Sequence, residues 1–144
     1  MFPVSMGKPP EISILSFPIL AQDIFKIALH NMREWKYQIS DSIDPMLTFI
    51  PYKTCYALAV QNDRRKKKSQ YKYTICLSTL IIDRFKPCKL TEALYNYIMH
   101  ELCHTIDGCF DHGKKWKEMV ISLNQNHGTK INPKPYSTKA SDLF

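Results

Sequence analysis

The sequence lacks a long apolar run and a recognisable secretory signal. Its uninterrupted apolar runs, such as Leu80-Ile81-Ile82, are far too short to cross a bilayer. The first 20 residues carry Glu11 and several prolines, without a basic region followed by a long apolar stretch. We therefore expect an intracellular protein, of the cytoplasm or nucleus, with no membrane partner.

The sequence also lacks a paired cysteine motif. Five cysteines stand at positions 55, 76, 88, 103 and 109, and no two of them form a C-x-x-C pair. The odd number and the spacing favour neither a disulfide framework nor a zinc ribbon. Reduced, mostly buried thiols are the simplest interpretation.

Acidic residues are scarce relative to basic ones. Lysine and arginine exceed aspartate and glutamate by seven, and the pI is about 9.2. This excess favours polyanionic partners, nucleic acid first, but says nothing about the fold. The length of 144 residues and the 44% hydrophobic content predict one domain with one core.

The pattern along the chain predicts an α+β domain over residues 17–127, between an extended arm (1–16) and an extended tail (128–144). A helix is expected from Pro18 to about Gln38. Residues 54–61 and 71–78 are typical of two antiparallel strands, and a third strand could lie near 47–51. Thr91 can cap a second helix that ends near Asp107-Gly108. A last helix is expected over about 113–125.

Five consecutive cations lie in the connector between the two expected strands: Arg64, Arg65, Lys66, Lys67 and Lys68. Clustered cations release counterions when they contact phosphates, so this hairpin tip is our predicted nucleic-acid contact. The alternative is a solvated turn that keeps the neighbouring edge strand from pairing with other chains.

The motif with the clearest chemistry is His100-Glu101-Leu102-Cys103-His104, an H-E-x-x-H match inside an expected helix. Residues four apart lie about one turn apart on one face, so both imidazoles can bind one ion. Zinc accepts imidazole nitrogen and leaves a position for water. Glu101 is placed to take a proton from a water that the metal activates. We predict Zn²⁺ bound by His100 and His104, with Glu101 as the general base.

A catalytic zinc site needs a third protein ligand. His112 is our choice, because it follows the short loop after Gly108 and directly precedes the last helix. Glu118 on that helix is the rival. The full set of candidates is His112, Asp107, Asp111, Glu118 and His127. Trp116 is expected to be a core residue that holds the last helix against the motif helix.

At this point the sequence resembles a known family. The segment from His100 to Lys117, with His112, Gly113 and Trp116 in an H-G-x-x-[FW] context, resembles the active-site segment of SprT-like metalloproteases. The resemblance implies a minimal zincin-like domain with His112 as third ligand. It also implies hydrolysis of DNA-associated proteins, including DNA–protein crosslinks. Many members carry a C-terminal zinc ribbon, for which this chain has no cysteine set after Cys109.

Three functions therefore compete. The first is a zinc endopeptidase acting on proteins bound to nucleic acid. The second is a nucleic-acid-binding module with a mainly structural zinc site, which Glu101 argues against. The third is a peptidase with no nucleic-acid role. For a peptidase, we expect the strand Tyr73–Ser78 to expose an edge with which an extended substrate pairs.

Overall fold

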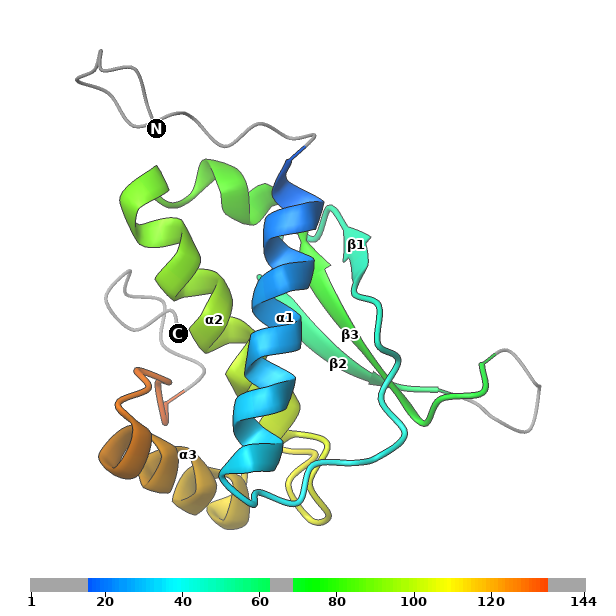
Figure 1. Cartoon of the computed structure of the whole chain (residues 1–144), viewed down its shortest axis with the longest axis vertical. Coiled ribbons are helices and arrows are strands. Elements are labelled where there is room, and N and C mark those ends of the chain that lie inside the picture. The colour runs from blue at the N-terminus through cyan, green and yellow to red at the C-terminus, as the bar shows by residue number, and fades with distance from the viewer. Residues whose placement is uncertain (1–15, 63–68, 135–144) are drawn as a thin grey trace.

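The computed structural model describes residues 16–62 and 69–134 (Figure 1). Within these residues the chain is α+β, as expected, with three α-helices, one 3₁₀ helix and a three-stranded sheet. The elements in order are α1 (Phe17–Glu34), β1 (Thr48–Ile50), β2 (Ala57–Gln61), β3 (Tyr73–Ser78), η3 (Thr79–Asp83), α2 (Pro87–Cys103) and α3 (Lys114–His127). None of the described helices is both long and apolar enough to span a membrane.

The sheet is mixed, with the strand order β1-β3-β2. The predicted antiparallel pair is confirmed by β2 and β3, in a register that sets Ala59 opposite Ile75. The third strand expected near residues 47–51 is confirmed as β1, but it runs parallel to β3, with Thr48 opposite Cys76, so the sheet is mixed rather than antiparallel. After α1 the chain returns along β3, starting with a bridge between Ile43 and Tyr73.

This strand order also corrects the expected substrate edge. Because β1 and β2 flank β3 on both sides, β3 is the central strand and has no open edge. The hydrophobic pattern of residues 43–50 explains the difference: Ile43 and Leu47 are buried, so this segment packs along β3 instead of forming a loop. Among the described strands, β1 and β2 lie at the two edges.

The first helix follows the predicted stripe but ends earlier than expected. Pro18 lies in the first turn, where its missing N–H costs no hydrogen bond. The helix stops at Glu34 rather than near Gln38, because Lys36 adopts a left-handed conformation with φ of 68°. The Lys36 and Tyr37 backbone N–H groups then bond carbonyls of the last turn.

The second helix begins earlier than the expected cap at Thr91. It starts at Pro87, with Lys86 extended before it. Proline is tolerated in the first turn, so Pro87 initiates the helix rather than preceding it. The helix ends at Cys103, and Gly108 with φ of 80° turns the chain back five residues later.

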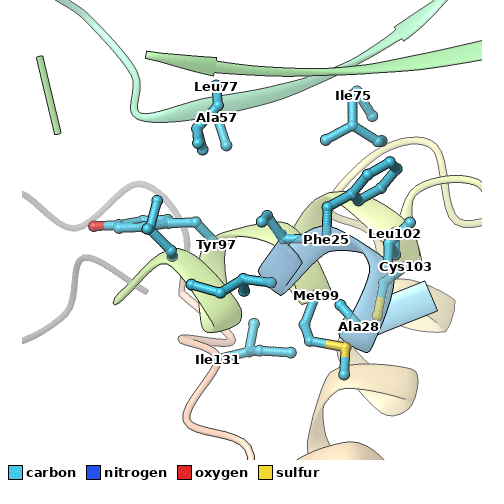
Figure 2. Packing of buried hydrophobic residues seen from close by; sticks show 14 of the residues in the cluster. Phe25, Ala28, Ala57, Ile75, Leu77, Tyr97, Met99, Leu102, Cys103 and Ile131 are labelled. Atoms are coloured by element: carbon cyan, nitrogen blue, oxygen red, sulfur yellow. The ribbon is translucent and has the colours of Figure 1, made fainter. Parts of the chain in front are cut away.

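The core lies between the two long helices and the sheet. Figures 1 and 2 show α1 and α2 together on one side of the strands, and α2 also contacts β2 and β3. Figure 2 shows Phe25 of α1, Ile75 and Leu77 of β3, and Leu102 of α2 meeting there. All four side chains are fully buried.

The core continues past the expected domain end at residue 127. Gly128, with φ of 70°, ends α3, and the chain then returns along α2. Ile131 is only 2% exposed and belongs to the core. The Lys130 backbone N–H donates to Asn96 Oδ1, and the Ile131 N–H donates to Asn124 Oδ1. The first residues of the predicted tail are therefore part of the packed domain.

Candidate metal centre

Three histidine side chains converge where α2 ends and α3 begins. The Nε2 atoms of His100 and His112 are 3.1 Å apart, and those of His104 and His112 are 3.0 Å apart. These three residues form a group whose ligand atoms lie within 4.8 Å of one another. The structure thus brings together the three residues that the sequence suggested as metal ligands.

The ring of His104 is held in one tautomer. Its Nδ1 lies 2.8 Å from the Cys109 carbonyl oxygen, which can only accept a hydrogen bond. The proton therefore lies on Nδ1, and Nε2 presents a lone pair toward the other two histidines. Burial lowers the pKa of His104 to about 4 and also lowers the pKa of His112. Both imidazoles are neutral at pH 7, the form that binds a metal.

Hydrogen bonding alone satisfies this arrangement poorly. His104 Nε2 carries no proton and can only accept a hydrogen bond. A proton on His112 Nε2 can be directed at the Nε2 of His104 or at that of His100, but not well at both. A cation between the rings would accept all three lone pairs at once. Ligand nitrogens around tetrahedral zinc lie about 3.3 Å apart, close to the spacing found here. The donor set therefore fits a metal ion.

The last helix completes the cluster through Trp116. His112 ends the loop that follows Gly108, and Lys114 begins α3 two residues later. Trp116 is fully buried, as expected of a core residue. Its ring stacks on His104 at 5.3 Å and 10° and lies 4.7 Å from the His100 and His112 rings. This ring fixes the imidazole orientations and excludes water from one side of the cluster.

Glu101 lies buried beside the histidines. Its Oε2 is 3.6 Å from His100 Nε2, and its Oε1 accepts a hydrogen bond of 3.0 Å from the Ala59 backbone N–H. Burial raises the pKa of this carboxyl to about 8, and the Ala59 hydrogen bond opposes the shift. A carboxyl group with a pKa in this range can both accept and release a proton near neutral pH.

The contact to Ala59 joins the site to the edge of the sheet. Tyr56 O accepts from Ser78 N and Asn62 N donates to Lys72 O, so even-numbered residues here face β3. The odd-numbered residues Ala57, Ala59 and Gln61 consequently direct their backbone groups away from β3. Glu101 meets this outward edge at its centre.

Sequence reasoning missed both backbone partners, Cys109 O and Ala59 N–H. Neither could have been found from residue types, because any residue other than proline offers the same backbone groups. The nearest signal was the H-E-x-x-H motif itself, since a buried glutamate needs a hydrogen-bond donor from a neighbouring element.

The other candidate ligands have different partners. Glu118 is 65% exposed and lies 3.9 Å from Lys114, and Asp111 accepts from the Gly113 backbone N–H. The His127 ring stacks on Trp35, with the ring centroids 3.8 Å apart. Asp107 is exposed. In the described part of the chain, none of these residues belongs to the histidine group.

The predicted nucleic-acid contact, Arg64 to Lys68, lies outside the described residues. The strands on either side of it, β2 and β3, form the expected pair. Asn62, which directly follows β2, joins the two, because its Nδ2 donates to Thr74 Oγ1 at 2.8 Å and to Tyr71 O at 3.0 Å.

Comparison with known proteins adds no relative. No protein-family model matches the chain, nor does any curated protein or solved structure. The functional argument therefore depends on the site itself.

Proposed function

We propose that this protein is a zinc-dependent metalloendopeptidase. The observation that carries the proposal is the convergence of three imidazole nitrogens beside the buried Glu101. Ordinary buried histidines bond to carbonyl or hydroxyl groups, whereas three that direct the same ring nitrogen at one point are typical of a metal site.

His100, His104 and His112 would hold the zinc ion. Zinc in such a site supplies a Lewis acid and lowers the pKa of water to about 7. The protein's own part is to orient the rings, through the Cys109 carbonyl and the contacts with Trp116, and to keep His104 and His112 neutral by burial.

Glu101 has the role of general base. Ala59 occupies Oε1, so Oε2, the oxygen nearer to His100, is the atom that accepts the proton from water and later delivers it to the departing amine. This hydrogen bond also fixes the rotation of the carboxylate, which keeps Oε2 directed toward the cluster.

The edge strand β2 is the substrate strand in this proposal, in place of β3. Its outward-facing backbone groups at Ala57 and Gln61 flank the Ala59–Glu101 contact. An extended peptide that pairs with these groups lies across the catalytic glutamate, as strand-addition binding requires.

A structural zinc site is the less favoured function. Structural zinc is usually held by four protein ligands, and the group found among the described residues contains three. A structural site also has no use for a buried glutamate with a pKa near 8.

The nucleic-acid part of the proposal rests on the sequence. It is supported by the net charge of +7, by the five cations of the hairpin tip, and by the resemblance of residues 100–117 to SprT-like metalloproteases. The proposed substrates are accordingly DNA-associated proteins. A peptidase with no nucleic-acid role is the alternative that the test must separate.

The test is proteolysis of a DNA-binding protein by the zinc-loaded full chain, with and without DNA, against a chelator control. The proposal predicts cleavage that DNA stimulates and the chelator abolishes. Cleavage that is indifferent to DNA would leave a peptidase without the nucleic-acid role. Cleavage that survives the chelator would contradict the metal site.

A further inference from the structure

Three aromatic residues form a cluster at one end of the edge strand. The ring centroids of Tyr56 and Tyr97 are 5.2 Å apart, those of Tyr56 and Phe85 are 5.9 Å apart, and those of Phe85 and Tyr97 are 6.1 Å apart. All three pairs have interplanar angles of 63–67°, the edge-to-face arrangement that aromatic rings favour. We call these residues the aromatic trio.

The aromatic trio lies next to the candidate metal centre. Tyr97 precedes Glu101 by one turn of α2, a rise of about 5.4 Å. Tyr56 directly precedes β2, whose Ala59 bonds Glu101. Figure 2 shows the Tyr97 ring leading away from the other labelled core residues, with its hydroxyl at the edge of the cluster.

The members of the trio differ in burial. Tyr97 is only 6% exposed, while Tyr56 and Phe85 are half-buried and pack against the core from outside. Within the trio, the Tyr97 ring is therefore buried, whereas the other two rings keep part of their apolar surface accessible. A bulky apolar side chain can gain both area burial and edge-to-face contacts on such a surface.

The direction of a peptide bound along β2 decides which of its residues lie opposite the aromatic trio. Ala57 and Gln61 each direct both their N–H and C=O outward. A peptide of either direction can use these groups, and the antiparallel direction is taken here because antiparallel pairing is the more stable. An antiparallel peptide centred on Ala59 runs toward Ala57 with the residues that follow the cleaved bond. Tyr56 precedes Ala59 by three residues, and each residue of an extended peptide advances about 3.3 Å. The trio therefore lies opposite the second or third of the residues that follow the cleaved bond.

We propose that Tyr56, Phe85 and Tyr97 form a specificity subsite for an aromatic or other bulky apolar side chain on the C-terminal side of the cleaved bond. The inference depends on the proposed peptidase function for its substrate and its direction. It adds a sequence preference that neither the metal centre nor the charge of the chain supplies.

A fourth aromatic ring offers a matched control at the other end of the strand. Phe110 is 48% exposed, and its ring lies 6.1 Å from Tyr73, the residue opposite Gln61. It therefore flanks the side of the peptide that precedes the cleaved bond. Removing this ring takes away a similar apolar surface without touching the trio.

The test uses two peptide hydroxamates that differ only in the second and third side chains after the metal-binding group, benzyl in one and methyl in the other. Their affinities for the zinc-loaded full chain are measured by calorimetry. We expect the benzyl compound to bind at least about tenfold more tightly, the lower end for filling an apolar subsite. Tyr56→Ala and Phe85→Ala should each reduce this ratio severalfold and leave the methyl compound's affinity unchanged. Phe110→Ala should keep the ratio.

Equal affinities in the wild-type protein, or a ratio that both trio variants retain, would overturn the subsite. If neither hydroxamate binds, a second measurement decides. The NMR shifts of the Tyr56 and Phe85 rings are recorded in the metal-free chain while a tripeptide is added, with phenylalanine at its centre in one titration and alanine in the other. Equal shifts for the two tripeptides would also overturn the subsite. Discrimination without any peptidase activity would refute the proposed function and leave the subsite standing.

Discussion

At the scale of single residues, the histidine cluster depends on the groups that position and orient its rings. His104 donates through Nδ1 to Cys109 O, so its other nitrogen is fixed in both position and protonation. His112 comes from a separate loop, and its Nε2 closes the group from the α3 side. The end of α2 thus positions His100 and His104, and a separate loop positions His112.

The ligand assignment predicts opposite results for two substitutions. His112→Ala removes one of three nitrogen donors, so zinc content should fall from about one per chain to well below half. Glu118→Ala, at an exposed residue paired with Lys114, should keep full zinc content. Metal analysis of the two purified variants measures this. Retained zinc in the first variant and lost zinc in the second would make the glutamate the ligand.

Glu101 predicts a pH dependence of the metal-free protein. In the folded chain its pKa is about 8, whereas an unfolded glutamate titrates near 4.5. Between these values the folded state holds more protons than the unfolded state, so the free energy of unfolding falls as pH rises. The depressed pKa of His104 acts in the opposite direction between about 4 and 6.5. Its contribution is common to any variant that keeps this histidine.

Glu101→Gln should therefore gain stability relative to the wild type as pH rises from 5 to 8, in the presence of a chelator. Urea unfolding at the two pH values gives the difference, which should grow by an amount on the order of 1 kcal/mol or more. A difference that does not change with pH would show that the buried carboxyl is not protonated in the metal-free fold.

At the scale of elements, sequence periodicity located the helices well and their ends less well. The stripes that predicted the three helices reflect burial against one core, which depends on spacing alone. The ends depend on local backbone geometry. Lys36 stops α1 by adopting a positive φ that its residue type does not favour, and Pro87 starts α2 where the sequence suggested Thr91.

The left-handed Lys36 predicts a stabilising substitution. A non-glycine residue in this region costs about 1–2 kcal/mol, which glycine avoids, although glycine loses more entropy on folding. Lys36→Gly should therefore leave the free energy of unfolding unchanged or raise it by up to about 1 kcal/mol. The control Lys26→Gly, inside α1, should lower it by about 1 kcal/mol. Equal destabilisation by both would contradict the role given to Lys36.

The position of β1 shows why the sheet order was not predictable. Alternation in residues 73–78 indicated a strand, but alternation carries no information about which neighbours flank it. The short strand Thr48–Ile50 pairs with β3 through backbone groups, and backbone pairing leaves no mark on residue type. The three histidines of the cluster were predictable because metal binding requires specific side chains.

At the scale of the whole molecule, the domain is closed by the segment after α3. Ile131 enters the core beside Met99 of α2, as Figure 2 shows, and the backbone there bonds to Asn96 and Asn124. A sequence boundary drawn where the helical pattern stops excludes this residue, because a single buried isoleucine has no periodicity to reveal it.

This closure predicts that Ile131→Ala destabilises the whole domain. Removing a fully buried isoleucine side chain typically costs about 2–5 kcal/mol. Lys130→Ala is the matched control, since its exposed ammonium pairs with Glu92 at the surface and should matter little. Thermal unfolding of both variants decides. A loss of stability no larger for Ile131→Ala than for the control would exclude this segment from the domain.

The central claim is that zinc held by the three histidines acts together with Glu101 in peptide hydrolysis. Its most direct test is to measure zinc content and hydrolysis of an unfolded protein substrate side by side in the wild type and in Glu101→Gln. The variant keeps the size of the side chain and an oxygen for the Ala59 hydrogen bond. The account predicts about one zinc per chain in both proteins, with hydrolysis at least about a hundredfold slower in the variant. Equal hydrolysis by both proteins, or loss of zinc from the variant, would contradict it.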